Sequence, residues 1–178
     1  MGPQCVGMVE KETRFVIELT VYSVLVSLLT RHRVVLLKEK EGDRYLPVWI
    51  GSNEADAIAM RLQGTRVSRP LTHDLLVNVI DELDADIQHI VVSELKNNTF
   101  YARIAIVSNG HEYSIDSRTS DAIAVAVRAQ VPIYADESVM EQGGILPSPD
   151  IRASVEDDES LDVFRDFVDS LDLDDLGE

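Results

Sequence analysis

The chain has 178 residues, of which 45% are hydrophobic and 27% are charged, and its formal net charge is −16. Such a composition is typical of one globular domain with a real core, and no apolar run reaches the length that a membrane span needs. The N-terminal residues show no secretory signal pattern, and the single Cys5 excludes an internal disulfide. We therefore expect a cytoplasmic protein with no membrane association.

The negative charge is concentrated towards the C-terminus. Residues 156–178 contain eleven acidic residues and one basic residue, so this segment carries −10 and residues 1–155 carry −6. Proteins that bind nucleic acid usually present a basic face to the phosphates, so this acidity argues against such a partner. Arg61, Arg66 and Arg69 are close in sequence, and Arg103, Arg118 and Arg128 could join them in space. These arginines form either a local basic patch or a set of separate solvated side chains.

The first half of the chain alternates strands and helices. A period-two pattern predicts the first strand, and a polar turn at 41–44 joins the next two strands into a hairpin. Two helices follow, the first ended by Gly64 and the second capped by Thr72. The expected strands are 15–21, 34–38 and 45–50, and the expected helices are 53–63 and 72–83. The apolar stripe of the second helix consists of Leu75, Leu76, Val79, Ile80 and Leu83.

The second half predicts an antiparallel meander followed by a buried helix. Turns at 96–99 and at Asn109-Gly110 separate strands at 87–95, 100–107 and 112–115. The helix expected at 119–130 has almost no polar face, so it should be buried in the domain or covered by a second subunit. A short strand at 132–135 and a short helix opening at 136–138 complete an α/β (α+β) domain. We expect an antiparallel-rich mixed sheet packed by about three main helices.

The domain boundaries follow from composition. We expect a flexible N-terminus at 1–13, one domain at 14–146, and a proline-containing linker with an acidic tail at 147–178. Within the tail, apolar residues recur at helical spacing, namely Leu161, Phe164, Val168 and Leu171. The tail is either a solvating extension or an amphipathic helix that docks on a basic groove of this protein or of a protein partner.

A near-repeat links two parts of the sequence. Residues 49–62 and 114–127 align without a gap, 65 positions apart, and Asp56 aligns with Asp121. Each copy reads as a strand, a short polar turn and a helix start, and helix starts favour anions because their N–H groups are unpaired. The alternative is that both aspartates only favour the first helical turn. We expect the two joints to lie close together, related by an approximate two-fold axis within the chain or across a subunit interface.

Five segments in order carry a family resemblance. They are residues 46–51, 54–59, 69–75, 99–103 and 115–124. Together they resemble the bifunctional nuclease (DNase/RNase) domain family of bacteria and plants, over roughly residues 15–140. The resemblance implies a mixed α/β domain and a nuclease that hydrolyses phosphodiester bonds of DNA and RNA. It implies no particular catalytic mechanism, so the site has to be argued from the residues.

The candidate residues belong to carboxylate and histidine chemistry, because the sequence has no phosphate-binding glycine loop and no zinc-type Cys/His spacing. Phosphodiester hydrolysis commonly uses a divalent cation held by carboxylates, so we expect Mg²⁺ or Mn²⁺ and no organic cofactor. Asp116 and Asp121 could converge across a turn, whereas two positions separate Glu54 from Asp56 and should direct them apart. The candidate metal ligands are Glu54, Asp56, Asp116 and Asp121.

The candidate catalytic residues are His73, Asp74, Asp116 and Asp121. His73 is the only histidine inside a matching motif, and it is either a general acid or base or an exposed residue of a first helical turn. Arg69 and Arg118 are candidate phosphate-binding residues, because a guanidinium can hold two phosphate oxygens at once.

The sequence therefore supports a nuclease with nucleic acid as partner. The alternative is a non-enzymatic interaction or regulatory module that binds a protein partner or a small anionic ligand at the helix starts. In either case the apolar helix at 119–130 predicts a homo-oligomer, because a chain of this size offers few layers to cover that helix.

Overall fold

The computed structural model describes residues 16–26 and 32–146, so the predictions for 1–13 and 147–178 lie outside the described residues. The described part forms a single α/β domain with one mixed sheet and four helices, as the sequence predicted. None of these helices combines the length and the apolar character that crossing a membrane requires.

The elements follow the predicted order closely. The strands are β1 (Val16–Val26), β2 (Arg33–Glu39), β3 (Tyr45–Ile50), β4 (Ala85–Lys96), β5 (Thr99–Ser108), β6 (His111–Arg118) and β7 (Ile133–Asp136). The helices are α1 (Ser52–Leu62), α2 (Thr72–Glu82), α3 (Thr119–Ala129) and α4 (Glu137–Gly143). The Asn109-Gly110 turn between β5 and β6 has positive φ at both residues, 51° and 74°, as a two-residue hairpin turn of this sequence requires.

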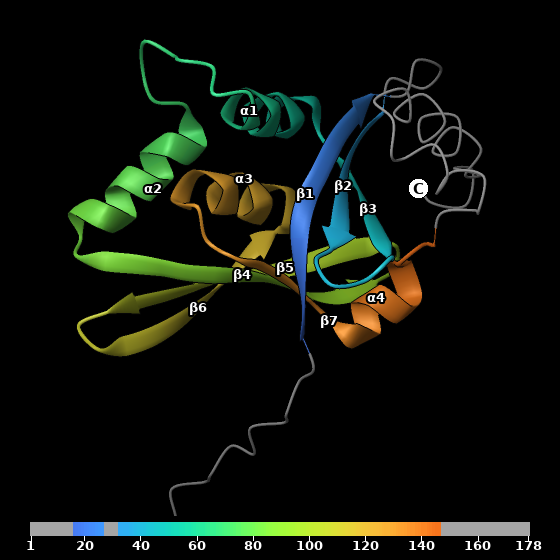
Figure 1. Cartoon of the computed structure of the whole chain (residues 1–178). Helices are drawn as coiled ribbons and strands as arrows, with labels where there is room; N and C mark the ends of the chain where they lie inside the picture. Colours follow the sequence, from blue (N-terminus) through green and yellow to red (C-terminus); the bar gives the residue numbers. More distant parts are fainter. Residues whose placement is uncertain (1–15, 27–31, 147–178) are drawn as a thin grey trace, which may run out of the picture.

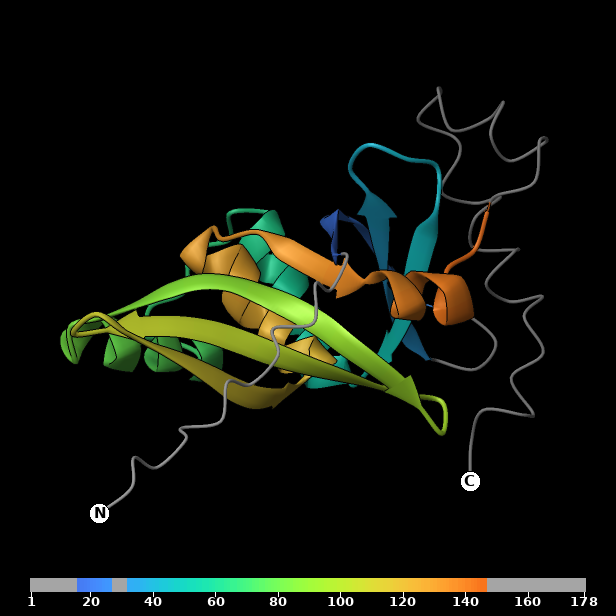
Figure 2. The same ribbon diagram turned by 90° about the horizontal axis from the view of Figure 1, so that it is seen from below.

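The seven strands form one sheet in the order β3-β2-β1-β7-β4-β5-β6. Every neighbouring pair is antiparallel except β4 and β7, which are parallel. Figure 1 shows that β1, β2 and β3 run steeply across the direction of β4 and β5, so the sheet turns strongly around β7. Figure 2 shows β4, β5 and β6 as one curved layer with the helices α2 and α3 behind it.

Helix α3 is the centre of the core. Ala122, Ile123, Ala124 and Val125 are fully buried, because the helix lies between the sheet and the helices α1 and α2 (Figure 1). The predicted burial of this helix is confirmed. The same chain supplies the cover, so the burial of α3 by itself does not require a second subunit.

Helix α2 lies with its predicted apolar stripe largely outward. His73, Val77 and Ile80 face the rest of the domain. Four apolar side chains of the stripe are exposed instead, namely Leu75, Leu76, Val79 and Leu83. Thr72, which was predicted as the N-cap, is instead the first helical residue, and Leu71 occupies the N-cap position. Polar contacts of His73 and Asp74 with α3, described next, fix the rotation of α2 about its axis.

Candidate functional site

The starts of α1, α2 and α3 meet around one opening, which we call the central cavity. It has a volume of about 490 Å³. Its lining comes from one side of α1 and from the starts of α2 and α3, and it consists of Asn53, Glu54, Asp56, Ala57, Met60, Leu71, Thr72, His73, Arg118 and Asp121. Asp56 and Asp121 therefore share one cavity, which confirms that the two joints of the near-repeat lie close together.

Arg118 joins the two joints directly. This residue ends β6 and is the N-cap of α3. Its Nη2 donates to Glu54 Oε1 at 2.7 Å, and its Nε donates to Asp121 Oδ2 at 2.7 Å. Both contacts raise the pKa of the Arg118 guanidinium, with the Asp121 hydrogen bond the larger cause. A Cβ at Gly51 would collide with Glu54 Oε2, so the glycine leaves room for the carboxylate that Arg118 binds.

Asp121 also holds His73. The Nε2 atom of His73 lies 2.9 Å from Asp121 Oδ1, and the His73 side chain is 11% exposed. Burial alone would raise the pKa of Asp121, but the hydrogen bonds from Arg118 and His73 outweigh it, so this pKa is lower than usual. Asp121 is thus ionised at neutral pH, which assigns the proton to Nε2 of His73 and leaves Nδ1 as the basic nitrogen. No described residue hydrogen-bonds Nδ1.

Asp74, the neighbour of His73, has a different set of partners. Its Oδ2 accepts a hydrogen bond from the Leu71 backbone N–H at 2.9 Å, and its Oδ1 accepts one from Arg128 Nε at 2.6 Å. Burial alone would raise the pKa of Asp74, but the Leu71 N–H and the Arg128 guanidinium hold it below its usual value. Both oxygens therefore serve to fix the start of α2.

Arg128 ties the three helices together. Besides Asp74 of α2, it donates to the carbonyl oxygen of Ala124 in α3 at 2.9 Å and to that of Ala57 in α1 at 3.2 Å. Its side chain is only 5% exposed. The sequence named Arg128 only as a possible member of a basic patch, and not as a residue that ties the helices together. The available signal was its place as the one charged residue after the apolar run of α3, since a buried arginine needs several acceptors.

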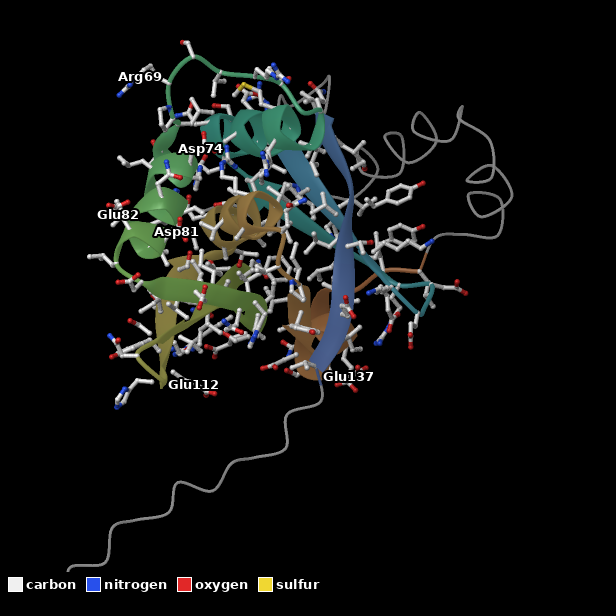
Figure 3. All side chains as sticks on the ribbon, turned by 60° about the vertical axis from the view of Figure 1, so that its left-hand side comes forward. Arg69, Asp74, Asp81, Glu82, Glu112 and Glu137 are labelled. Carbon is white, nitrogen blue, oxygen red and sulfur yellow. The ribbon has the colours of Figure 1, made fainter. Side chains whose placement is uncertain are left out.

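A second opening, the arginine cavity, lies beside the central one. It has a volume of about 570 Å³ and is lined mainly by the end of α1 and the loop to α2, and it shares Met60 and Leu71 with the central cavity. Its lining includes Arg61, Arg66, Arg69 and Arg128, with Asp74 as the one carboxylate. Figure 3 shows Arg69 on the connecting loop and Asp74 at the start of α2.

The guanidinium groups of the arginine cavity are not all used in the same way. Arg128 pairs with Asp74, and Arg61 donates to the carbonyl oxygens of Val127 and Arg128 at 3.3 and 3.2 Å. Neither Arg66 nor Arg69 forms an ion pair with a described residue. The local basic patch that the sequence left open is therefore present, and Arg69 belongs to it rather than to the central cavity.

Two candidate metal ligands, Asp56 and Asp116, lie outside the polar network that Arg118 forms with Glu54 and Asp121. Asp56 is exposed and lies 3.4 Å from Arg33 of β2. Asp116 is not among the residues that line the central cavity, and it lies within β6, which continues to Arg118 instead of ending at residue 115. Its role as a catalytic residue or metal ligand stays a prediction. In the sheet, Asp116 pairs with Arg103 of β5.

The described residues do not form a preassembled metal site. Within 16–26 and 32–146, no three His, Cys, Asp or Glu side chains gather closely enough to hold an ion. Glu54 and Asp121 approach one another, but the guanidinium of Arg118 lies between them and forms an ion pair with each. The carboxylates as arranged do not fit a divalent cation, and the expected Mg²⁺ or Mn²⁺ stays a prediction.

Comparison with known proteins identifies one family for this chain. A model of the bifunctional nuclease domain matches residues 35–148. An uncharacterized protein of Mycobacterium tuberculosis (Rv1829) is 38% identical over 163 residues, which cover 89% of this chain and 97% of that protein.

Plant relatives are more distant and longer. Bifunctional nuclease 1 of Oryza sativa subsp. indica is 24% identical over 124 residues, which cover 66% of this chain and 38% of that protein. Bifunctional nuclease 1 of Arabidopsis thaliana is 23% identical over 118 residues, which cover 64% of this chain and 36% of that protein. This chain therefore spans well under half of the plant proteins that carry the nuclease name.

Proposed function

Because the chain belongs to the bifunctional nuclease domain family, we propose that it is a nuclease that hydrolyses phosphodiester bonds of DNA and RNA. The observation that best supports a catalytic role for particular residues is the His73–Asp121 pair, with 2.9 Å between Nε2 and Oδ1, in the lining of the central cavity. A histidine held by an ionised carboxylate is a common arrangement for moving protons at neutral pH.

Each group has a role in this mechanism. Nδ1 of His73 takes a proton from a water molecule as its oxygen attacks the phosphorus, and Asp121 orients the ring and stabilises the imidazolium. The imidazolium then returns the proton to the oxygen that leaves when the phosphorus–oxygen bond breaks. Arg118 uses Nε and Nη2 for the two carboxylates, which leaves Nη1 to contact a phosphate oxygen.

The central cavity and the arginine cavity carry opposite net charges. Three carboxylates and one arginine line the central cavity, whereas four arginines and one carboxylate line the arginine cavity. A phosphate chain is therefore attracted to the arginine cavity, and Arg66 and Arg69 are the groups free to bind it. The overall acidity of the protein is compatible with a nucleic-acid partner because the positive charge is local.

The dependence of cleavage on a divalent metal ion is left to the assay below, which compares Mg²⁺, Mn²⁺ and EDTA. A cation would have to displace Arg118 from Glu54 and Asp121, so no step above depends on one. The rival function, a module that binds a protein partner or a small anionic ligand, would use the same arginine cavity without cleavage. Measurement of cleavage separates the two.

The test is a nuclease assay on highly purified protein with fluorescently labelled DNA and RNA, in Mg²⁺, in Mn²⁺ and in EDTA. His73→Ala should lower the cleavage rate on the order of 100-fold or more. The matched control is His111→Ala, since His111 is exposed at the start of β6 and contacts only the Asn109 carbonyl oxygen. Equal cleavage by the wild-type protein, His73→Ala and His111→Ala would identify a contaminating nuclease and contradict the proposal.

A further inference from the structure

A third opening, the tryptophan cavity, adjoins the central one. It has a volume of about 420 Å³ and lies between the end of β3, the β4–β5 turn and the start of α3. Arg118 lines both cavities, so the two are neighbours across this side chain. Its lining includes two aromatic residues, Trp49 and Phe100, and two hydroxyl residues, Thr119 and Ser120, and it contains no carboxylate.

Two polar atoms in this lining lack partners. Thr119 is 3% exposed, and its Oγ1 is buried without a hydrogen bond. Trp49 Nε1 is likewise buried and unbonded. No described residue supplies a contact to either group. Buried polar atoms in folded proteins nearly always have a partner, so these two atoms have hydrogen-bonding capacity that the described residues do not use.

The available groups favour an anion. The indole N–H of Trp49 can only donate, and the Thr119 hydroxyl can donate as well. Arg118 contributes Nη1, which is the one guanidinium nitrogen not used by Glu54 or Asp121. The first turn of α3 has no side-chain cap, so its N–H groups are also open to an acceptor. A phosphate group offers acceptors to all of these donors.

We propose that the tryptophan cavity binds one unstacked nucleotide of the substrate, with its phosphate at Thr119 and Arg118 and its base against Trp49 and Phe100. The inference rests on the proposed nuclease function and adds the substrate class, which is single-stranded nucleic acid or an unpaired strand end. A cavity of about 420 Å³ is at the small end of ligand sites and accommodates one nucleotide, not a duplex. A base inside a duplex stack cannot enter it without leaving the helix.

The three cavities then form one path for the strand. Both outer cavities adjoin the central cavity: the arginine cavity shares Met60 and Leu71 with it, and the tryptophan cavity shares Arg118. Phosphates then bind in the arginine cavity and at Arg118, and the bond to be cut lies over His73. Aromatic contact with bases is how many proteins bind single strands without reading their sequence.

Trp49 provides the measurement because it is the only tryptophan of the chain. Its fluorescence is followed while a short single-stranded oligonucleotide is added to full-length His73→Ala protein, so that binding is read without cleavage. Parallel titrations use a duplex of the same sequence, a nucleoside monophosphate and inorganic phosphate. We expect saturable quenching by the single strand and by the mononucleotide, and little change with the duplex.

The specific variant is Thr119→Val, which removes the orphaned hydroxyl and keeps the shape. It should weaken single-strand binding about tenfold, because a hydrogen bond to a charged group is lost. Its thermal stability should be unchanged or higher, because a buried unpaired polar group is removed. Phe100→Leu should weaken binding by a similar factor. Thr20→Val on the exposed side of β1 is the matched control and should change neither property.

The outcomes are distinct. Unchanged affinity in Thr119→Val with retained fold, or equal quenching by the duplex, would overturn the proposed subsite. Inorganic phosphate that competes as well as the mononucleotide would also overturn it, because the base would then contribute nothing. Protein that binds the single strand through Thr119 but never cleaves it would refute the nuclease function and leave the subsite in place.

Discussion

Glu54 and Asp121 are each the third residue of a helix, α1 and α3 respectively, and both accept a hydrogen bond from Arg118 at 2.7 Å. The sequence repeat aligned Asp121 with Asp56, yet the structure makes Glu54 its counterpart. Arg61 and Arg128 correspond in the same way, as the tenth residues of these helices. Glu54 and Asp121 thus occupy equivalent helical positions, whereas the ungapped sequence alignment had paired Asp56 with Asp121.

The two carboxylates should differ in their effect on cleavage. Asp121→Asn removes the charge that holds His73 and stabilises its protonated form, so we expect cleavage to fall on the order of 100-fold. Glu54 hydrogen-bonds Arg118 and not His73, so Glu54→Gln should lower the cleavage rate far less. Single-turnover rates on a labelled oligonucleotide check the difference. Equal losses in the two variants would show that His73 does not depend on Asp121.

Arg128 should be a large contributor to stability. Arg128→Ala leaves the Asp74 carboxylate without its partner and two buried carbonyl oxygens without a donor, at a cost of about 3 kcal/mol. Arg61→Ala is the matched control at the same helical position, and its two carbonyl contacts at an exposed site should cost less than about 1 kcal/mol.

Urea unfolding measures both values. The double variant Asp74→Asn, Arg128→Met should recover part of the loss, because no unpaired charge remains. Similar free energies of unfolding for Arg61→Ala and Arg128→Ala would mean that Arg128 does not act as the tie between the helices.

The fold was largely predictable because the local signals agreed with the tertiary structure. Gly64 has a φ of 66°, as the predicted glycine at the end of the first helix requires, and the Asn109-Gly110 turn set the β5–β6 register. Of the candidate site, His73, Asp121, Arg118 and Glu54 are brought together around one cavity. These residues lie at element ends, where the sequence marks the boundaries clearly.

The rest depended on long-range contacts that no local pattern reveals. The outward rotation of α2 follows from its tie to Arg128, which lies 54 positions from Asp74. The sequence ended this strand at residue 115, whereas β6 extends to Arg118, so Asp116 lies inside the strand and not in a turn. The use of Arg118 as a counterion for both carboxylates required the three-dimensional meeting of two joints.

Acid should destabilise the protein through Asp74 and Asp121. Both carboxyl groups have a lower pKa in the folded state, so their contribution is complete above the unfolded pKa and is lost as pH falls through the folded value. The loss should begin below about pH 3.8, the ordinary pKa of aspartate. Urea midpoints measured from pH 7 down to pH 2 check this. Asp74→Asn should flatten the curve, and an unchanged slope in that variant would assign the effect to other groups.

The exposed stripe of α2 should mediate a homo-oligomer. Leu75 is 57% exposed and Leu83 is 69% exposed, and such stripes are usually covered. Figure 3 shows Arg69 beyond one end of α2 and the acidic Asp81 and Glu82 at the other. Two copies packed antiparallel through this helix would therefore place opposite charges together, as a two-fold contact requires.

Light scattering coupled to gel filtration tests the assembly. Leu75→Lys with Leu83→Lys should reduce the protein to a monomer that keeps its circular dichroism spectrum. Leu62→Lys, at an equally exposed apolar position on α1, is the control and should leave the mass unchanged. A wild-type protein that is monomeric at all concentrations would contradict the expectation of a homo-oligomer.

The acidic tail should compete with nucleic acid for the arginine cavity. Residues 156–178 lie outside the described structure, but their charge of −10 complements Arg66 and Arg69, which no described carboxylate pairs. Deleting them changes the net charge from −16 to −6 and removes a competitor that is tethered at high local concentration. Affinity for single-stranded nucleic acid should rise severalfold at about 50 mM salt, and the gain should shrink as salt screens the contacts.

A charge reversal in the cavity shows whether the tail acts there. In protein carrying Arg66→Glu and Arg69→Glu, deletion of the tail should leave affinity unchanged, because both competitors have lost the same site. A gain of the same size in that background would place the tail elsewhere, and no gain in the wild type would make it a solvating segment or a docking helix for a protein partner. Truncated protein that binds no nucleic acid at about 50 mM salt, where even weak phosphate contacts register, would favour the interaction-module alternative over the nuclease.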